Sequence, residues 1–339
     1  MYKTKEYEGI DYFRVIAAML IIAIHTSPLS SVNDTADFVF TRIIARIGVP
    51  FFFMTTGFFL LPQYIGKTGP RDNLIRFFKK VLRLYAIAIL LYLPVNIYAG
   101  YFNDTSLFPK IIKDVVFDGT FYHLWYLPAV IMGVGIVYVL LKMCKPKNVF
   151  YITVMLYVVG LFGDSYYGIA QKIPFLKSSY DLIFKFSDYT RNGIFFAPIF
   201  LFLGGMIGKS NKRVHVKKHV MGLIVSTILL LSEGLCLNNF SLQRHDSMYF
   251  MLLPCMYFLF QLVLLWQGRS KKILRKVSMC VYLVHPFFII LVRGFAKLTD
   301  LSWLLIDNSI VHYLMVVITS FIFSFFYSTV ASRKRIGNS

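Results

Sequence analysis

The run DYFRVIAAMLIIAIH at residues 11–25 sets the class of protein. Every residue between Arg14 and His25 is apolar, and with its flanks the run is long enough for a helix that crosses a bilayer. Across the chain, 57% of the residues are apolar and 15% are charged. A soluble domain of this size needs more charge to cover its surface. The sequence therefore predicts an integral membrane protein.

Further apolar segments follow this first one and predict an all-α bundle of about ten transmembrane helices. The ten segments are residues 11–29, 38–62, 80–100, 124–142, 148–163, 193–208, 219–237, 248–266, 277–293 and 309–330. The fifth and sixth are short. We expect one membrane domain over residues 1–339 without a soluble domain, and a short cap in the long connection at about 164–192.

The distribution of charge predicts the orientation in the membrane. Lysine and arginine concentrate in the segments that this topology places on one side, whereas most carboxylates fall on the other. The main basic segments are 71–83, 209–218, 269–276 and 333–335. Because basic loops stay in the cytoplasm, we expect a multi-pass protein of the cell membrane with both termini inside. On this interpretation the net charge of +20 comes from cytoplasmic loops. The expected partner is the lipid bilayer, and binding to nucleic acid is not expected.

Arg14 and His25 stand eleven positions apart on the first predicted helix. At 100° per residue they lie about 20° apart on one face and roughly 16 Å apart along the axis. An ionisable group within a span is a candidate for a functional site. The alternative is that the two residues form no site. In that case the arginine side chain extends to the membrane interface, and the histidine lies at the interface as well.

Three more charged residues fall within predicted spans. Arg42 and Arg46 have the i, i+4 spacing of one helical face, where two guanidinium groups could bind an anion. They could equally reach lipid phosphates. Glu233 lies in the seventh span, where a carboxylate needs a cation or a proton; either an ion pair or a binding role satisfies it.

Other polar residues cluster at the expected outer helix ends. They belong to the motifs His123-Leu-Trp-Tyr-Leu-Pro, Asp188-Tyr-Thr-Arg-Asn-Gly and Arg244-His-Asp-Ser-Met-Tyr. Aromatic residues at such depths usually form the interfacial belt. His285 stands alone in the ninth span and could be a packing residue or part of a site. The four cysteines form no C-x-x-C pair, so we expect neither a disulfide framework nor a metal site.

Taken in order, these motifs resemble the acyltransferase-3 family of integral membrane proteins. The matching elements are the Arg14–His25 pair, Gly48-Val-Pro-Phe-Phe-Phe-Met-Thr-Thr-Gly57 (with Thr56 where the family usually has serine), His123-Leu-Trp-Tyr-Leu-Pro and Tyr282-Leu-Val-His285-Pro. The resemblance covers nearly the whole chain. It implies an acyltransferase-3-like bundle.

A closer resemblance is to the membrane half of the membrane-bound serine racemases of vancomycin-type antibiotic resistance. It is carried by Phe121-Tyr-His-Leu-Trp-Tyr, Gly163-Asp-Ser-Tyr, Thr190-Arg-Asn-Gly-Ile-Phe-Phe and His245-Asp-Ser-Met-Tyr. Those racemases carry a pyridoxal-phosphate domain after the membrane half. No stretch of this chain could form such a barrel of roughly 250 residues, so racemase activity is not expected of it.

The first functional hypothesis is acyl transfer. The family resemblance implies an acyl-CoA co-substrate on the cytoplasmic side, an acceptor such as a cell-envelope glycan or small molecule on the outer side, and no tightly bound cofactor. His25 would be the general base, because the ordinary pKa of imidazole lies near neutrality, and Arg14 would hold the donor or stabilise negative charge. The cations expected to bind the CoA phosphates are Arg71, Arg76, Lys80 and Arg83.

The second hypothesis is an L-serine binding or uptake module for a racemase partner on another chain. A zwitterion needs a cation and an anion, which Arg191 with Asp188, or Arg244 with Asp246, would supply. The candidate substrate-binding residues under either hypothesis are Arg42, Arg46, His123, Trp125, Asp188, Arg191, Glu233, Asp246 and His285.

Overall fold

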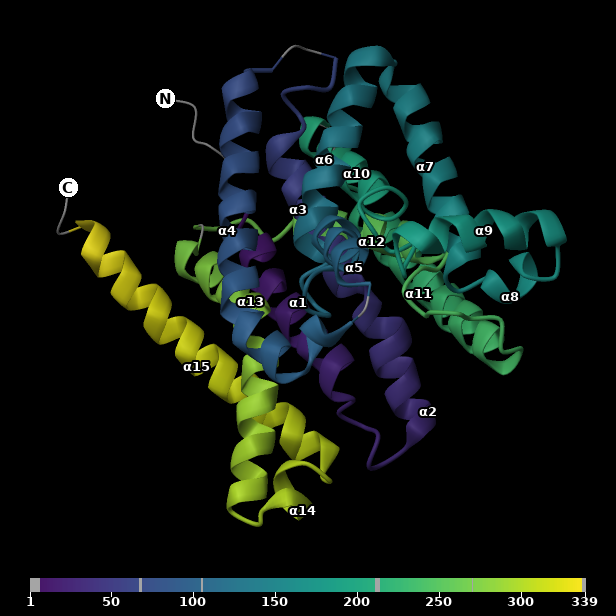
Figure 1. Cartoon of the computed structure of the whole chain (residues 1–339). Coiled ribbons are helices and arrows are strands. Elements are labelled where there is room, and N and C mark those ends of the chain that lie inside the picture. The colour runs from purple at the N-terminus through teal and green to yellow at the C-terminus, as the bar shows by residue number, and fades with distance from the viewer. Residues whose placement is uncertain (1–6, 67–68, 105, 211–213, 270, 337–339) are drawn as a thin grey trace. The chain divides into compact units, whose positions relative to one another are not determined.

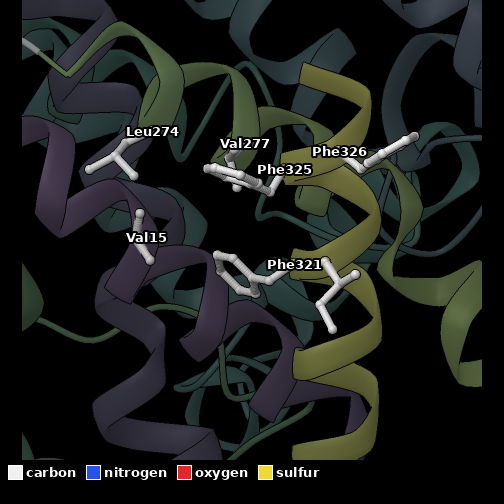
Figure 2. A pocket seen from close by; sticks show the side chains of 7 residues that line it. Val15, Leu274, Val277, Phe321, Phe325 and Phe326 are labelled. Carbon is white, nitrogen blue, oxygen red and sulfur yellow. The ribbon is translucent and has the colours of Figure 1, made fainter. Parts of the chain in front are cut away.

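The structure is a computed structural model that describes residues 7–66, 69–104, 106–210, 214–269 and 271–336, with side chains up to residue 330. Every regular element within these residues is helical. Lys212, Arg213 and the side chains of the basic segment 333–335 lie outside the described part. The all-α bundle expected from the sequence is therefore confirmed for the described residues (Figure 1).

The helices form two compact units that interleave along the chain. Unit 1 comprises Met1–Phe52, Val214–Gly234 and Pro254–Ser339, and unit 2 comprises Phe53–Arg213 and Leu235–Leu253. Unit 1 holds α1 (Glu8–Thr26), α2 (Asp34–Asp37), η1 (Phe38–Ile43), η2 (Ile44–Ile47), α13 (Lys272–Leu298), α14 (Ser302–Leu305) and α15 (Ser309–Ile336). Unit 2 holds α4 (Arg71–Tyr98), η3 (Tyr101–Asn103), α5 (Leu107–Lys113), η4 (Asp114–Asp118), α6 (Tyr126–Met143), α7 (Pro146–Gly163), α8 (Tyr167–Ala170), α9 (Pro174–Phe186) and α10 (Ala197–Lys209). The division passes through α3 (Gly48–Leu60), α11 (Val216–Asn239) and α12 (Leu252–Val263).

Eight of the described segments are long and apolar enough to cross a membrane. They correspond to eight of the ten predicted spans. The other two, expected at 193–208 and 248–266, are the shorter apolar helices α10 and α12, of 13 and 12 residues. The fifth predicted span, expected to be short, is the 18-residue helix α7. The expected cap at 164–192 contains α8 and α9.

Two predicted helices differ from the observed ones. α4 begins at Arg71 rather than near residue 80, so the basic residues placed in a loop lie on its first turns. The second span is not one regular α-helix, because η1 is a π-helix and η2 a 3₁₀-helix before α3 begins at Gly48. These turns hold i→i+5 and i→i+3 hydrogen bonds respectively, which a hydropathy pattern does not distinguish from α-helical turns.

Unit 1 is built around the packing of α1, α13 and α15 (Figure 1). The N-terminal end of α1 is fixed by Asp11, whose carboxylate is fully buried. It accepts hydrogen bonds from Arg275 Nε at 2.6 Å and from the backbone N–H of Lys271 at 2.8 Å. Gly9 donates its N–H to the carbonyl of Trp266 at 3.0 Å, and a Cβ at Gly9 would lie 2.2 Å from a backbone oxygen. Only glycine fits this approach.

Unit 2 has a core of aromatic side chains from α7 and α10. Tyr157 is fully buried, stacks on Phe196 with ring centroids 6.1 Å apart, and meets the edge of Phe200. Its hydroxyl donates to the carbonyl of Tyr249 at 2.7 Å. This bond ties α7 to the segment before α12, which carries part of the site described below.

We expect reporter fusions at Asp104 and Asp246 to lie outside the cell, and fusions at Lys145 and Lys272 to lie inside. The reason is that the basic segments of this chain favour the cytoplasmic side. Alkaline phosphatase and green fluorescent protein fusions would measure this. A reversed result at two or more of the four positions would contradict the predicted orientation.

Candidate functional site

In unit 1, His25 lies against His285. His25 is in the last turn of α1, and His285 lies in the interior of α13, followed by Pro286. The two imidazole rings stack with centroids 5.4 Å apart and an angle of 26° between their planes. His285 is fully buried. The structure thus brings together two histidines that are 260 positions apart in the sequence.

The protonation of His285 follows from its backbone contacts. Its Nδ1 lies 2.9 Å from the carbonyl of Tyr282 and 3.1 Å from that of Val281. A carbonyl oxygen only accepts hydrogen bonds, so Nδ1 carries the proton. In the neutral ring the lone pair is then on Nε2. The packing therefore holds His285 in one tautomer beside His25.

Arg14 and His25 are both on α1, which is one uninterrupted α-helix over Glu8–Thr26. The regular α-helix that the prediction of a shared face assumes is therefore present from Arg14 to His25. Arg14 is half-buried and lies one turn after the buried carboxylate of Asp11. The separation of about 16 Å along the axis means that Arg14 and His25 cannot contact the same small group.

Arg42 and Arg46 lie on differently wound turns. Arg42 is in the π-helix η1 and the buried Arg46 is in the 3₁₀-helix η2. The uninterrupted α-helix that their predicted i, i+4 face assumes is therefore not present at these residues. Gly234 of α11 packs closely against Ile43, where an added Cβ would lie 2.5 Å from its side chain. Glu233 directly precedes Gly234, so its backbone lies near the segment that carries both arginines.

In unit 2, the carboxylate of Asp164 follows the last residue of α7 and is fully buried. Its Oδ1 accepts hydrogen bonds from the N–H of Ser247 at 2.7 Å, the N–H of Met248 at 3.0 Å and the hydroxyl of Ser165 at 3.0 Å. Its Oδ2 accepts none from the residues that the structure describes. A buried carboxylate oxygen without a donor is costly in a folded protein, and this geometry is suited to a ligand that brings a donor.

Arg191 lies beside this carboxylate. Its guanidinium lies 4.2 Å from the ring centroid of Tyr189 and 5.3 Å from that of Trp125. Its Nη1 donates to the hydroxyl of Ser247 at 3.2 Å, so Arg191 and Asp164 bind two atoms of the same serine. Contacts with two aromatic faces fix the direction of the guanidinium beside the carboxylate.

Burial controls the titration of this cluster. Burial raises the pKa of Asp164 to about 6, although the N–H of Ser247 and the charge of Arg191 act to lower it. The ring of His245 packs at a tilt against that of Tyr189, with centroids 4.4 Å apart. Burial, with the charges of Arg191 and Arg244, lowers the pKa of His245 to about 4. At neutral pH the cluster therefore holds an ionised Asp164 carboxylate, a neutral His245 imidazole and cationic guanidinium groups.

The other predicted residues of unit 2 are placed differently. Asp188 is exposed and forms an ion pair with Lys113, so its carboxylate is turned to α5. The half-buried Asp246 directly precedes Ser247, and its charge acts on Asp164. His123 is buried against the ring of Tyr92, with centroids 5.0 Å apart, in an aromatic cluster.

Three of the four predicted CoA-binding cations share one face of α4. Arg76, Lys80 and Arg83 lie within about 60° of one another around the helix, and all are exposed. Arg76 Nη2 also donates to Asn73 Oδ1 at 2.6 Å. Arg71, the first residue of α4, points in a different direction, more than about 100° from this face.

Sequence reasoning did not select Asp164, Ser247, Tyr189 or His245 as site residues. The available signal was a run of polar residues, Asp164 and Ser165, directly after an apolar segment. What sets Asp164 apart is that it is buried by a loop 83 positions further along the chain. Only the packing of that loop against the end of α7 makes this visible.

Relatives with curated names match nearly all of this chain. An amino-acid racemase of Enterococcus faecalis is 49% identical over 321 residues, which are 94% of this chain and 45% of the relative. A second amino-acid racemase of that organism is 38% identical over 93% of this chain and 45% of its own length. A serine/alanine racemase of Enterococcus gallinarum is 36% identical over 92% of this chain and 44% of its own length. The chain thus spans less than half the length of the relatives that it matches.

No solved structure matches the chain significantly. The family model described as acyltransferase domain, of the acyltransferase-3 type, matches residues 7–329. That range contains every helix from α1 to α14 and most of α15, and both groups of site residues. The chain is therefore a multi-pass membrane protein that belongs to the acyltransferase-3 family.

Proposed function

We propose that this protein is a membrane acyltransferase that moves an acyl group from a cytoplasmic acyl-CoA to an acceptor at the outer face. The acceptor would be a cell-envelope glycan or a small molecule with a nucleophilic hydroxyl or amine. The observation that carries the proposal is the stack of His25 on His285 at 5.4 Å. A stacked pair of histidines within a membrane bundle is expensive unless it has a function.

In this mechanism His25 acts as the general base. It takes the proton of the acceptor hydroxyl while the oxygen attacks the thioester carbonyl. The tetrahedral intermediate then breaks the carbon–sulfur bond, and the CoA thiolate receives the proton from the His25 imidazolium. The neutral ring of His285 supports that imidazolium through its π face. Because Arg14 is about 16 Å away along α1, it would hold a distant part of the donor rather than the reacting carbonyl.

The donor's phosphates would be bound by the exposed cations of α4. We expect the double variant Arg76→Ala, Arg83→Ala to weaken CoA binding by one to several decades. Each arginine–phosphate contact is charge-assisted and contributes about 1.5–3 kcal/mol. Calorimetry with CoA on the purified protein measures this.

Arg71→Ala is the matched control, because Arg71 is on the same helix but on another face. It should change CoA binding much less than the double variant. Equal losses in the two variants would indicate a general charge effect rather than a binding face, and unchanged binding in the double variant would remove α4 from the donor site.

A second candidate function is the binding or uptake of a free amino acid, with L-serine as the first substrate to test and a racemase on another chain as partner. Two observations favour it. The relatives of this chain carry the names amino-acid racemase and serine/alanine racemase. Asp164 and Arg191 offer, beside one shared serine, an acceptor for an ammonium group and a donor for a carboxylate. In this function Asp164 takes the anionic role that the sequence suggested for Asp188.

A further inference from the structure

The short helix α9 has an exposed apolar side that no residue described in the structure covers. Phe175, Leu182 and Phe186 are 77%, 56% and 62% exposed. At 100° per residue these three lie within about 40° of one another. With 13 residues, α9 is too short to cross a bilayer, so this apolar stripe is not explained as the lipid-facing side of a span.

A second side of α9 is fixed to the protein. Tyr180 is buried, and its hydroxyl donates to the carbonyl of Val159 on α7 at 2.6 Å. Phe184 packs on the ring of Tyr167 at 5.6 Å and lies under the guanidinium of Arg244 at 3.4 Å. This side is centred about 160° from the stripe. The orientation of the stripe is therefore set by contacts on another side of the helix.

A third side is polar. Lys177 and Asp181 form an exposed i, i+4 ion pair at 2.8 Å, and the exposed Lys185 lies next to them around the helix. The centre of this polar side lies about 120° from the stripe and about 80° from the side fixed to the protein. A helix in the plane of a bilayer interface, beside a transmembrane bundle, needs one side for acyl chains, one for protein and one for water. α9 has all three.

We propose that α9 is an interfacial helix whose Phe175–Leu182–Phe186 stripe inserts into the bilayer at the end of α7. Figure 1 shows α9 turned away from the direction of α7, which ends at Gly163, eleven positions before α9 begins at Pro174. α9 is attached to α7, a helix of the same unit that is long enough to span the membrane, through the bond from Tyr180 to Val159. Lys177 and Lys185 complement lipid phosphates, as expected for an amphipathic helix of this kind.

This placement bears on the candidate site in unit 2. α9 ends at Phe186, and the next residues lead directly to Tyr189 and Arg191. Ser187 is buried and its hydroxyl donates to Asp118 Oδ1 at 2.8 Å. The segment that carries Arg191 is therefore held between the protein core and a helix seated in the bilayer.

Spin labels at single cysteines test the proposal on the full chain in bilayer discs of phosphatidylcholine and phosphatidylglycerol. The four native cysteines are replaced by alanine, and labels are placed with Phe175→Cys, Leu182→Cys and, as the matched control on the polar side, Lys177→Cys. We expect collisions with oxygen, which dissolves in acyl chains, to exceed collisions with a water-soluble nickel chelate at 175 and 182. The order should reverse at 177.

Two results would overturn the proposal. A label at 182 that meets the nickel chelate as often as the label at 177 would place the stripe in water. A label at 182 that neither reagent reaches would mean that protein, such as a second copy of this chain, covers it. A lipid-borne carbene photolabel on the unmodified protein gives an independent measurement: it should modify Phe175, Leu182 and Phe186, and it should spare Lys177 and Asp181.

Discussion

His25→Ala should lower acyl transfer by about 10²–10⁴-fold, the contribution usual for a general base. Without the imidazole, no group at that position takes the acceptor proton while the thioester is attacked. The ring of His25 packs on His285 through one face and is half-buried, so its loss should leave the bundle inserted and folded. Transfer of a radiolabelled acyl group from acyl-CoA in membranes, normalised to the amount of protein, measures the effect.

His219→Ala is the matched control in the same unit. His219 lies in the first turn of α11, and its Nδ1 is 2.9 Å from the carbonyl of His215. Its removal should leave acyl transfer near the wild-type rate. A well-expressed His25→Ala protein with near-wild-type acyl transfer would remove the proposed mechanism. Wild-type L-serine uptake in this variant, with acyl transfer lost, would show that the two activities use different sites.

Asp164→Asn should weaken L-serine binding by roughly 10²-fold, since truncating one partner of a buried charged pair costs about 2–5 kcal/mol. Asparagine keeps an acceptor oxygen for the N–H groups of Ser247 and Met248, which hold the loop. It replaces Oδ2 by an NH₂ group, which cannot accept a hydrogen bond from an ammonium. Arg191→Ala should cause a loss of similar size by removing the partner of the carboxylate. Calorimetry with L-serine measures both.

The matched control is Asp104→Asn, a half-buried aspartate of unit 2 that is paired with Lys110 at 3.1 Å. It should leave serine binding unchanged, and neither site variant should alter CoA binding. Saturable serine binding that depends on Asp164 and Arg191, with no detectable CoA binding, would favour the second candidate function. The absence of serine binding in the wild-type protein would eliminate that function and leave acyl transfer untouched.

The pH dependence of binding gives a separate test of Asp164. Because burial raises the pKa of this carboxyl to about 6, it is ionised at pH 7 and protonated below about 6. Only the ionised form attracts an ammonium, so the affinity for L-serine should be constant above that pH and fall about tenfold for each unit below it. The Asp164→Asn protein should lack this decline. A decline that persists in the variant would assign the titration to another group.

The sequence alone determined the class of protein, the approximate positions of its spans and the Arg14–His25 pair. These features depend on the length and apolarity of continuous segments, and on the regular geometry of one helix, so they are local. The resemblance of the ordered motifs also identified the family, which the match over residues 7–329 confirms. Local patterns failed where the backbone departs from the α-helix, as at Arg42 and Arg46.

Only the tertiary structure decided which polar residues meet. His285 is a lone histidine in the sequence until α13 packs on α1 and places its ring on His25. Asp164 becomes a buried carboxylate only because the loop at Ser247 closes over it, whereas Asp188, in a more promising motif, is drawn away by Lys113. Burial and pairing depend on contacts between residues far apart along the chain. Neither composition nor spacing contains those contacts, since the packing of whole helices determines them.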